Sequence, residues 1–368
     1  MQNEQSEQSE SSPIPMADWV DDRYRIRDLL GALLHVDIPK SAKTFYFGGI
    51  TLFLFIVQVI TGSLLTLYYQ PSEETAYESV LLITSSVNFG WLIRSIHSWG
   101  ANLMIIFTVL HLLRIFFQGV YKRPRELTWA VGIGLLAITL AFGFTGYLLP
   151  WDQRAYWATT VGSESAGAVP FIGEYLLLLM RGGEEISGAT LSRFFGVHTL
   201  LLPLTLALLV TIHLVLIHQQ GIANPRKRSP SRVAPPESQE EQGAEEEKKV
   251  PFFPHYVLSE LIAWYVILGV LIVLASMFPV GLEEQADPLQ TPPHIKPEWY
   301  FLSLYQLLKY VPRTFGVLLG MLALPMLLLL PFIDRGPDRR PRARLFIIIT
   351  GLVALTAVVG LTIWGWFS

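Results

Sequence analysis

Seven long stretches contain no Asp, Glu, Lys or Arg at all, and these stretches limit what the chain can fold into. A helix that crosses a bilayer needs about 20 consecutive, predominantly apolar residues, and each stretch is apolar enough to supply them. We therefore predict an all-α integral membrane protein with seven transmembrane helices, A to G. The predicted spans lie within 44–72, 95–113, 127–151, 194–225, 261–282, 314–333 and 345–368.

The composition of the 368-residue chain agrees with this prediction. Only 15% of the residues are charged and the mean hydropathy is +0.42, whereas about 25% of residues are charged in typical soluble domains. A disordered or nucleic-acid-binding chain is thereby excluded, and a purely soluble enzyme is disfavoured. The stretch 79–93 is short and partly polar, so we place it outside the bilayer core. Residues 1–15 are polar and lack the apolar segment of a cleavable signal peptide.

Lysine and arginine residues predict the orientation of the helices. The N-terminal tail and the B–C, D–E and F–G loops together carry 19 of them, and the loops on the other face carry 6. Positively charged loops stay on the cytoplasmic side. We therefore expect a multi-pass protein of the bacterial cytoplasmic (inner) membrane. Its N-terminus would lie on this cytoplasmic side (the n side) and its C-terminus on the opposite side (the p side).

A charged, proline- and glutamate-rich segment divides the chain into two halves. We predict a disordered N-terminal tail over 1–15 and a disordered linker over 224–250. Between them, 16–223 would form a four-helix domain, and 251–368 would form a three-helix C-terminal domain. Residues 18–34 alternate apolar and charged side chains in a way that predicts an amphipathic helix on the membrane surface.

Four histidines inside predicted helices B and D point to cofactor binding. His97 and His111 lie 14 residues apart on helix B, and His198 and His213 lie 15 apart on helix D. In an α-helix these steps return to within about 40° and 60° of the starting direction, with a rise of roughly 21–22 Å. Each pair therefore faces roughly one side. Because B and D run in the same direction, His97 lies level with His198 on the p side and His111 with His213 on the n side.

Such histidine pairs suit the axial ligation of haem iron, since imidazole is present without any competing thiolate. We predict two stacked b-type haems in a four-helix bundle. Alternatively, an intramembrane histidine can simply form hydrogen bonds between helices, but two pairs at matched spacing favour the haem hypothesis.

Glycines on the other two helices repeat the spacing of 14. Glycine would let a macrocycle lie against the backbone, although small residues also favour ordinary helix packing in membranes. Arg94 and Arg114 bracket predicted helix B, where each could pair with a haem propionate or extend to the membrane interface. The glycines are Gly48 and Gly62 on helix A, and Gly132 and Gly146 on helix C.

These residues carry a resemblance to cytochrome b of the bc1 and b6f complexes, over about 17–368. The b6f side is more similar, because of the 15-residue spacing on helix D and the three-helix second half. Here the equivalents of cytochrome b6 and subunit IV would be joined in one chain. The matching motifs are 90–97 (GWLIRSIH), 122–129 (KRPRELTW), 146–151 (GYLLPW) and 297–300 (PEWY).

The resemblance implies two non-covalent b-type haems, of low potential on the p side and high potential on the n side. The b6f family carries a further haem on a cysteine near the position of Tyr46. Because this chain has no cysteine, no covalent haem is expected on it.

The implied function is that of the cytochrome b subunit of a quinol:cytochrome c/plastocyanin-type oxidoreductase. Such a complex oxidises quinol on the p side in a bifurcated reaction and passes one electron to a Rieske iron–sulfur protein. The other electron crosses through the two b haems and reduces quinone on the n side, which generates a proton gradient. The implied partners are the Rieske protein, a c-type cytochrome, quinol and quinone, and lipid, in a homodimeric complex, with no nucleic acid.

Four polar residues match the quinone sites of the family. Glu298 and Tyr147 would lie at the p-side quinol site, and His218 and Glu260 at the n-side quinone site, although each could be an ordinary interfacial or loop residue. Tyr156 and Trp157 resemble the wall of the quinol pocket, and 170–173 resembles the docking surface for the Rieske protein.

Two other classes of protein remain as alternatives at this point. A dihaem b membrane anchor of a dehydrogenase or hydrogenase would share the histidines, but it would lack the PEWY segment and the three-helix second half. A transporter with structural intramembrane histidines would bind no haem.

Overall fold

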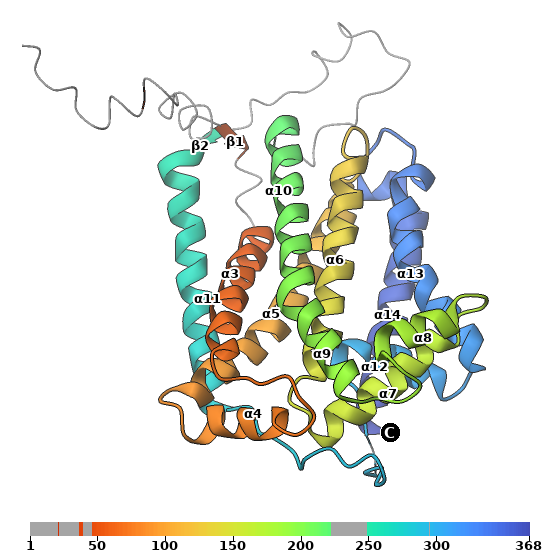
Figure 1. Ribbon diagram of the computed structural model, residues 1–368. Coiled ribbons are helices and arrows are strands. Elements are labelled where there is room, and N and C mark those ends of the chain that lie inside the picture. Colours follow the sequence, from red (N-terminus) through yellow and green to blue (C-terminus); the bar gives the residue numbers. More distant parts are fainter. Residues whose placement is uncertain (1–20, 22–36, 40–45, 222–248, 294) are drawn as a thin grey trace, which may run out of the picture.

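The computed structural model describes residues 21, 37–39, 46–221, 249–293 and 295–368 (Figure 1). Within these residues, seven helices are long and apolar enough to cross a membrane, which confirms the predicted number. The predicted tail 1–15, surface helix 18–34 and linker 224–250 lie outside the described residues, apart from residue 21 and the last two residues of the linker. The spans are Phe47–Thr66 (α3), Gly90–Gln118 (α5), Glu126–Tyr147 (α6), Gly188–Gln220 (α9, π-helical η2 and α10), Phe252–Met277 (η4 and α11), Arg313–Ile333 (α13) and Pro341–Phe367 (η5 and α14).

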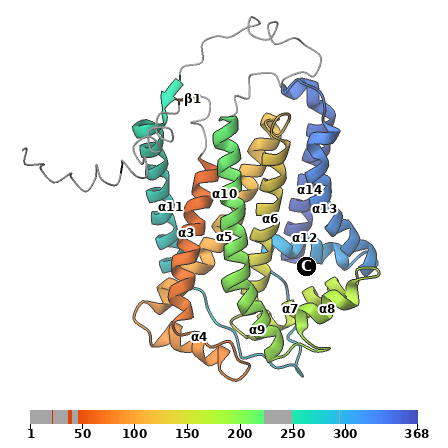
Figure 2. The same cartoon turned by 45° about the horizontal axis from the view of Figure 1, so that its top comes forward.

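Helices α3, α5, α6 and α10 form the central bundle, as Figures 1 and 2 show from two directions. Helix α3 packs against α5, α5 against α6, and α6 against α10. Aliphatic side chains from three of these helices meet inside it, including Leu54, Met104 and Leu206, and Leu271 of α11 joins the same core. The bundle therefore brings together the four helices that carry the predicted histidines and glycines.

The three C-terminal spans do not stack on one another as a separate bundle. Helix α11 packs against α3 and α5 on one side of the central bundle, whereas α13 packs against α6 on the other. Helix α14 packs against the short helix α12 (Trp299–Leu308). A helix that is apolar all round can bury any of its faces against protein or lipid, so sequence pattern alone does not predict this division.

Short helices cover the p-side end of the bundle. They are α4 (Ala76–Ser85), α7 (Gln153–Gly167), α8 (Gly173–Arg181), α9 (Gly188–Gly196) and α12. Helix α4 overlaps the stretch 79–93 that we placed outside the bilayer core, whereas residues 90–93 of that stretch begin the span α5. Asp152 caps α7 by accepting a hydrogen bond from the Ala155 amide at 2.9 Å, and its backbone pairs with that of Gln285. This pairing fixes the C–D segment to the E–F segment.

One small sheet adds to the predicted all-α fold. Strand β1 (Asp37–Pro39) pairs antiparallel with β2 (Lys249–Pro251), with Ile38 opposite Val250. The pairing joins the chain before α3 to the chain before α11. Three-residue strands offer too short a pattern for sequence analysis to detect.

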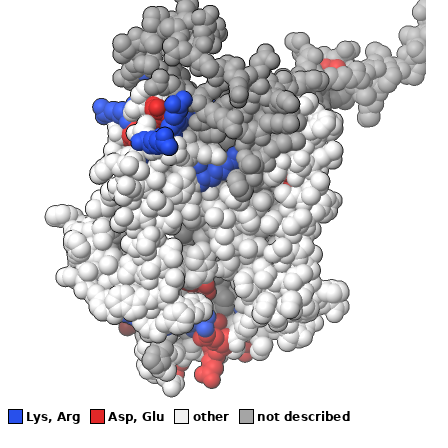
Figure 3. Space-filling model, turned by 180° about the vertical axis from the view of Figure 1, so that it is seen from behind, with Lys and Arg blue, Asp and Glu red and all other residues white. Residues whose placement is uncertain are grey.

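On the face that Figure 3 shows, charged side chains gather at the two ends of the molecule and the middle is white. Lysines and arginines collect at the end that carries the α5–α6 and α13–α14 connections, whereas acidic side chains dominate the other end. A middle band without charge fits a bilayer core, where unpaired charges are expensive.

A buried ionic cluster holds α13 and α14 to the central bundle at the n-side end. Asp334 pairs with Lys122 at 2.7 Å and with Arg344 at 2.7 Å, and all three side chains are buried. The Tyr121 hydroxyl donates a further hydrogen bond to Asp334 at 2.6 Å. Burial alone would raise the pKa of Asp334, but hydrogen bonds from Lys122, Tyr121 and Arg344 lower it below its ordinary value.

Removing this carboxylate should destabilise the protein strongly. Asp334→Asn leaves Lys122 and Arg344 as uncompensated buried cations, and breaking a buried pair from one side costs about 3–5 kcal/mol. We expect a clearly lowered midpoint of thermal unfolding in detergent. The control is Glu283→Gln, which removes the exposed pair with Arg154 and should cost at most about 1 kcal/mol. Equal midpoints for the two variants would contradict this role for Asp334.

Candidate haem and quinone sites

The first predicted histidine pair comes together between α5, which carries His97, and the π-helix η2 at the start of α10, which carries His198. The ring centroids of His97 and His198 are 6.4 Å apart, and the ring planes are 70° to one another. Two metal–imidazole bonds of about 2 Å each, together with the half-widths of two five-membered rings, account for a separation of this size. The pair therefore fits one metal ion held between the two rings.

Hydrogen bonds fix which nitrogen of each p-side ring is free. The Nδ1 of His97 lies 2.9 Å from the Thr61 hydroxyl, and that hydroxyl donates its proton to the Val57 carbonyl at 2.7 Å. Thr61 must therefore accept a hydrogen bond from Nδ1–H. Thr145 lies in the same way 3.0 Å from Nδ1 of His198 and donates to the carbonyl four residues earlier at 2.8 Å. Both Nε2 lone pairs are thus available for a metal.

The second predicted pair, His111 and His213, lies at the other end of the same two helices. The two rings are near enough to interact electrostatically. Their Nδ1 atoms are buried and have no hydrogen-bond partner among the residues that the structure describes. Within the same residues, no group of three or more His, Cys, Asp or Glu side chains could hold a metal ion. Each site therefore brings two imidazoles together, the number that axial haem ligation requires.

Each predicted glycine lies against one predicted ligand. A Cβ added at Gly62 would lie 3.2 Å from Cε1 of His97, and at Gly146 only 2.5 Å from Cε1 of His198. The corresponding distances are 3.2 Å from Gly48 to His111 and 3.6 Å from Gly132 to His213. We expected the glycines to make room for the macrocycle. In the structure, the group that fills this room is the ligand ring.

A π-helical segment explains the unequal histidine spacings. Residues Val197–Leu201, which include His198, form the π-helix η2 between α9 and α10. A π turn contains one more residue than an α turn would. Fifteen residues that include such a turn therefore cover about the same rotation as 14 residues of regular α-helix. This segment lets His198 and His213 match the levels of His97 and His111.

The two arginines lie within α5 rather than bracketing it. Arg94 donates hydrogen bonds to the carbonyls of Val280 and Gly281, at 2.8 and 2.9 Å, and so anchors the segment that follows α11. Arg114 lies near the His111 ring and near Tyr256. Arg114 therefore shares the n-side end of the bundle with the second histidine pair.

Glu298 and Tyr147 lie near each other at the end of the bundle that we predict to face the p side. Burial raises the pKa of Glu298 above its ordinary value, and nearby Arg154 opposes the shift. The Tyr147 hydroxyl is buried, and Glu298, Arg154 and Tyr300 all lie close enough to act on it electrostatically. Arg154 also forms an ion pair with Glu283. Arg154 was missed from sequence, because a single arginine in a loop carries no signal.

The segment that carries Glu298 is fixed to two helices of the central bundle. The Trp299 indole donates a hydrogen bond to Asn102 of α5 at 2.6 Å. A Cβ at Gly143 of α6 would lie 2.9 Å from the Tyr300 ring, so only glycine allows this close approach. Asn102 and Gly143 are further residues that the sequence did not single out.

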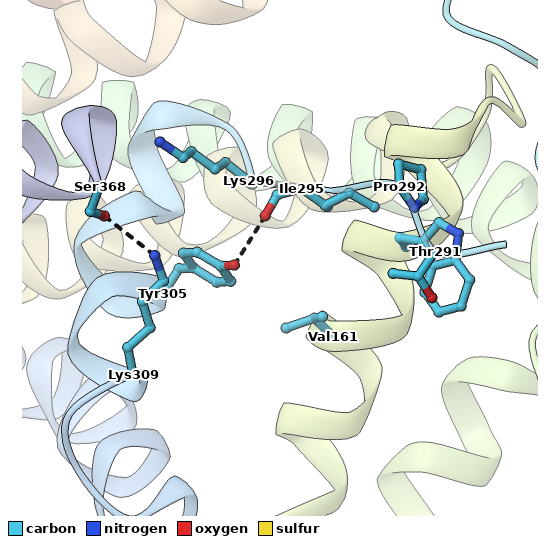
Figure 4. Close-up of a pocket in the computed structure, with 9 residues that line it drawn as sticks. Val161, Thr291, Pro292, Ile295, Lys296, Tyr305, Lys309 and Ser368 are labelled. Atoms are coloured by element: carbon cyan, nitrogen blue, oxygen red, sulfur yellow. Dashed lines mark hydrogen bonds between the residues drawn. The ribbon is translucent and has the colours of Figure 1, made fainter.

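A pocket of about 300 Å³ adjoins this segment (Figure 4). The Tyr305 hydroxyl donates to the Ile295 carbonyl at 3.0 Å, and Lys309 donates to the Ser368 hydroxyl at 3.3 Å. Trp157 and Val161 of α7 form the opposite wall. The sequence predicted Trp157 as part of the wall of the quinol pocket, and in the structure Trp157 lines this cavity. Lys296, which also lines it, lies two positions before Glu298 in the sequence.

The two residues predicted for the n-side quinone site lie on different helices. The Glu260 carboxylate of α11 contacts Gly49 of α3, next to the Gly48 that faces His111. His218 is exposed near the end of α10. Between His218 and Glu260 the structure shows neither a hydrogen bond nor an ion pair. The structure therefore places Glu260 against the residue that follows Gly48, and it shows no such contact for His218.

Known proteins match both halves of the chain. Residues 34–221 match the family described as cytochrome b/b6/petB, and 285–367 match cytochrome b(C-terminal)/b6/petD. A cytochrome bc complex cytochrome b subunit from Chlorobaculum thiosulfatiphilum is 40% identical over 346 residues, which cover 92% of this chain and 78% of that protein. Cytochrome b6 from Prochlorococcus marinus is 44% identical over 212 residues, 57% of this chain and 97% of that protein.

A solved structure shares the fold. A chain of a hyperthermophilic respiratory complex III superposes with a TM-score of 0.83 at 34% identity, covering 95% of this chain and 91% of that one. The family matches extend over both halves, and they agree with the paired histidines and the PEWY segment. The chain therefore belongs to the cytochrome b family, as the cytochrome b subunit of a bc-type quinol oxidoreductase complex.

Proposed function

We propose that His97 with His198, and His111 with His213, are the axial ligands of two non-covalent b-type haems. When bound, these haems supply an electron path between the two faces of the membrane. The protein presents the imidazoles at two levels of one bundle and excludes water from them. One observation carries the proposal: each of the four imidazoles lies against its own glycine, at all four predicted positions.

We further propose that quinol is oxidised on the p side, beside Glu298 and Tyr147. Glu298 would accept a proton from the quinol hydroxyl, because its raised pKa brings the carboxyl nearer the range in which a base works at neutral pH. Arg154 would hold the ionised carboxylate. The pocket that Trp157, Lys296 and Tyr305 line is a cavity near this place, and neither Glu298 nor Tyr147 lines it.

On the n side, we propose quinone reduction near Glu260, with His218 as a second proton donor. Glu260 is favoured by its contact beside the second histidine pair. The basic end of Figure 3 supports placing this face on the cytoplasmic side of a bacterial inner membrane, with the C-terminus on the p side.

The subunits we propose as partners are a Rieske iron–sulfur protein and a c-type cytochrome, in a homodimeric complex. The docking surface proposed for the Rieske protein is the p-side segment 170–173, in which Phe171 and Ile172 are both exposed. Exposed apolar side chains of this kind suit contact with another protein.

Ligand substitutions test the haem assignment. His198→Ala should remove the p-side haem and leave the n-side haem, because the two pairs share no residue. His213→Ala should do the reverse. The measurement is the reduced-minus-oxidised spectrum of each purified variant, with haem counted per chain. His218→Ala is the control, since it removes a histidine outside both pairs and should keep two haems. Two haems with unaltered spectra in His198→Ala or His213→Ala would refute the pairing.

A further inference from the structure

The two histidine pairs differ in one contact. On the p side, both Nδ1 atoms reach a threonine hydroxyl, Thr61 for His97 and Thr145 for His198. On the n side, neither His111 nor His213 has such a partner among the residues that the structure places. Backbone carbonyls do not explain the difference, since one lies near the His198 ring and one near the His213 ring.

The sequence shows the same difference at the four glycines. On the p side, each glycine follows a threonine, in Thr61-Gly62 and Thr145-Gly146. On the n side, the preceding residues are Phe47 and Val131, which have no hydroxyl group. The residue before each glycine therefore decides whether a hydroxyl reaches the ligand ring.

The threonines act as hydrogen-bond acceptors toward the rings. Each hydroxyl gives its proton to the carbonyl four residues earlier, at 2.7 Å for Thr61 and 2.8 Å for Thr145. Each must then accept from Nδ1–H. Because the hydroxyl is polarised by its own donated bond, it is a stronger acceptor than an isolated hydroxyl. Both threonines are buried, so water does not compete for the contact.

We propose that Thr61 and Thr145 lower the reduction potential of the p-side haem relative to the n-side haem. The inference rests on the haem ligation proposed above. An Nδ1–H that donates a hydrogen bond makes the imidazole a more basic ligand. A more basic ligand stabilises the oxidised iron more than the reduced iron, so the potential falls. Two such bonds to threonine hydroxyls act on the p-side site, whereas neither n-side ring reaches a hydroxyl among the described residues.

The test is a potentiometric titration of the full complex. Thr61→Val and Thr145→Val keep the shape of the side chain and remove the acceptor. A neutral hydrogen bond contributes about 1 kcal/mol, so we expect each variant to raise the reduced-to-oxidised ratio of the p-side haem severalfold at fixed ambient potential. A tenfold change would correspond to ~59 mV for one electron. The n-side potential should not move. Thr61→Ser and Thr145→Ser should restore the parent value.

A matched control lies on the same helix as Thr145. Thr139 is buried in α6 and donates to the carbonyl four residues earlier at 2.8 Å, and within the described residues it shows no hydrogen bond to a histidine. Thr139→Val should leave both potentials unchanged. An equal upward shift in Thr139→Val would mean that any lost helix hydroxyl has this effect, and would overturn the proposal.

A variant that adds a hydroxyl group on the n side keeps the proposal testable if a valine variant fails to assemble. Val131→Thr places a hydroxyl one residue before the Gly132 that faces His213, and it should lower the n-side potential alone. The proposal is overturned if both haems bind and neither the valine variants nor Val131→Thr shifts its own haem. If the parent complex binds no haem at these histidines, the ligation itself is wrong, and haem content separates that outcome from the first.

Discussion

Gly146→Ala is expected to remove the p-side haem, whereas Gly132→Ala should leave the n-side haem in place. The reason is the space in front of each ligand. A Cβ at position 146 would lie 2.5 Å from Cε1 of His198, which is far inside van der Waals contact, but a Cβ at position 132 would lie 3.6 Å from His213. The His198 ring cannot retreat and still keep its hydrogen bond to Thr145. Haem content and the reduced-minus-oxidised spectrum of each variant measure the effect.

Larger side chains make the comparison more complete. Gly132→Leu should also prevent n-side haem binding, because its branched side chain reaches well beyond the 3.6 Å gap. Gly134→Ala is the matched control on the same helix: its Cβ would meet only Leu209, at 3.7 Å. Full haem content in both Gly146→Ala and Gly132→Leu would show that these glycines are ordinary packing residues.

Glu298→Gln is expected to slow quinol oxidation by about 10²-fold, the lower end of the range for loss of a general base. A base must be ionised to accept a proton, so the parent rate should fall as the pH drops through the pKa of Glu298. Because burial raises that pKa, the fall should occur above the ordinary carboxyl range near about 4.3. The variant should lack this part of the pH profile. Steady-state quinol oxidation across pH measures both effects.

Two controls distinguish the loss of the proton acceptor from a structural disturbance of the segment that carries Glu298. Glu284→Gln changes an exposed carboxylate on the same segment and should keep the parent rate and pH profile. Haem content of Glu298→Gln should be normal, since the carboxyl lies outside both histidine pairs. If Glu298→Gln keeps the parent rate and profile, Glu298 is only a loop acid, and the proton needs another acceptor, with Tyr147 the first to test.

Sequence predicted the spans and the histidine positions well, because both depend on local, periodic features. A sufficiently long stretch without charged residues predicts a membrane helix, whichever neighbours the helix packs against. Histidines and glycines at intervals of 14 or 15 recur on one side of a helix whatever surrounds them. Spacing therefore placed Gly48, Gly62, Gly132 and Gly146 at the two levels of the histidine pairs, but it did not show that each glycine faces a ligand ring rather than the macrocycle.

The features that sequence missed depend on contacts between distant segments. The hydrogen bond from Trp299 to Asn102 joins residues 197 positions apart. Arg154 gains its place near Glu298 only when the C–D and E–F segments meet. The π-helical turn at His198 was also missed: the spacing of 15 was visible, but nothing in the residue types required a π turn there.

The central claim is that one chain holds two haems, each between two histidines. The most direct measurement is the haem-to-chain ratio of the purified parent protein, combined with a potentiometric titration followed in the b-type absorption bands. The account predicts two haems per chain, which titrate as two separate one-electron steps, with the lower step absent in His198→Ala and the higher step absent in His213→Ala. A single haem per chain, or two haems that both survive either substitution, would contradict it.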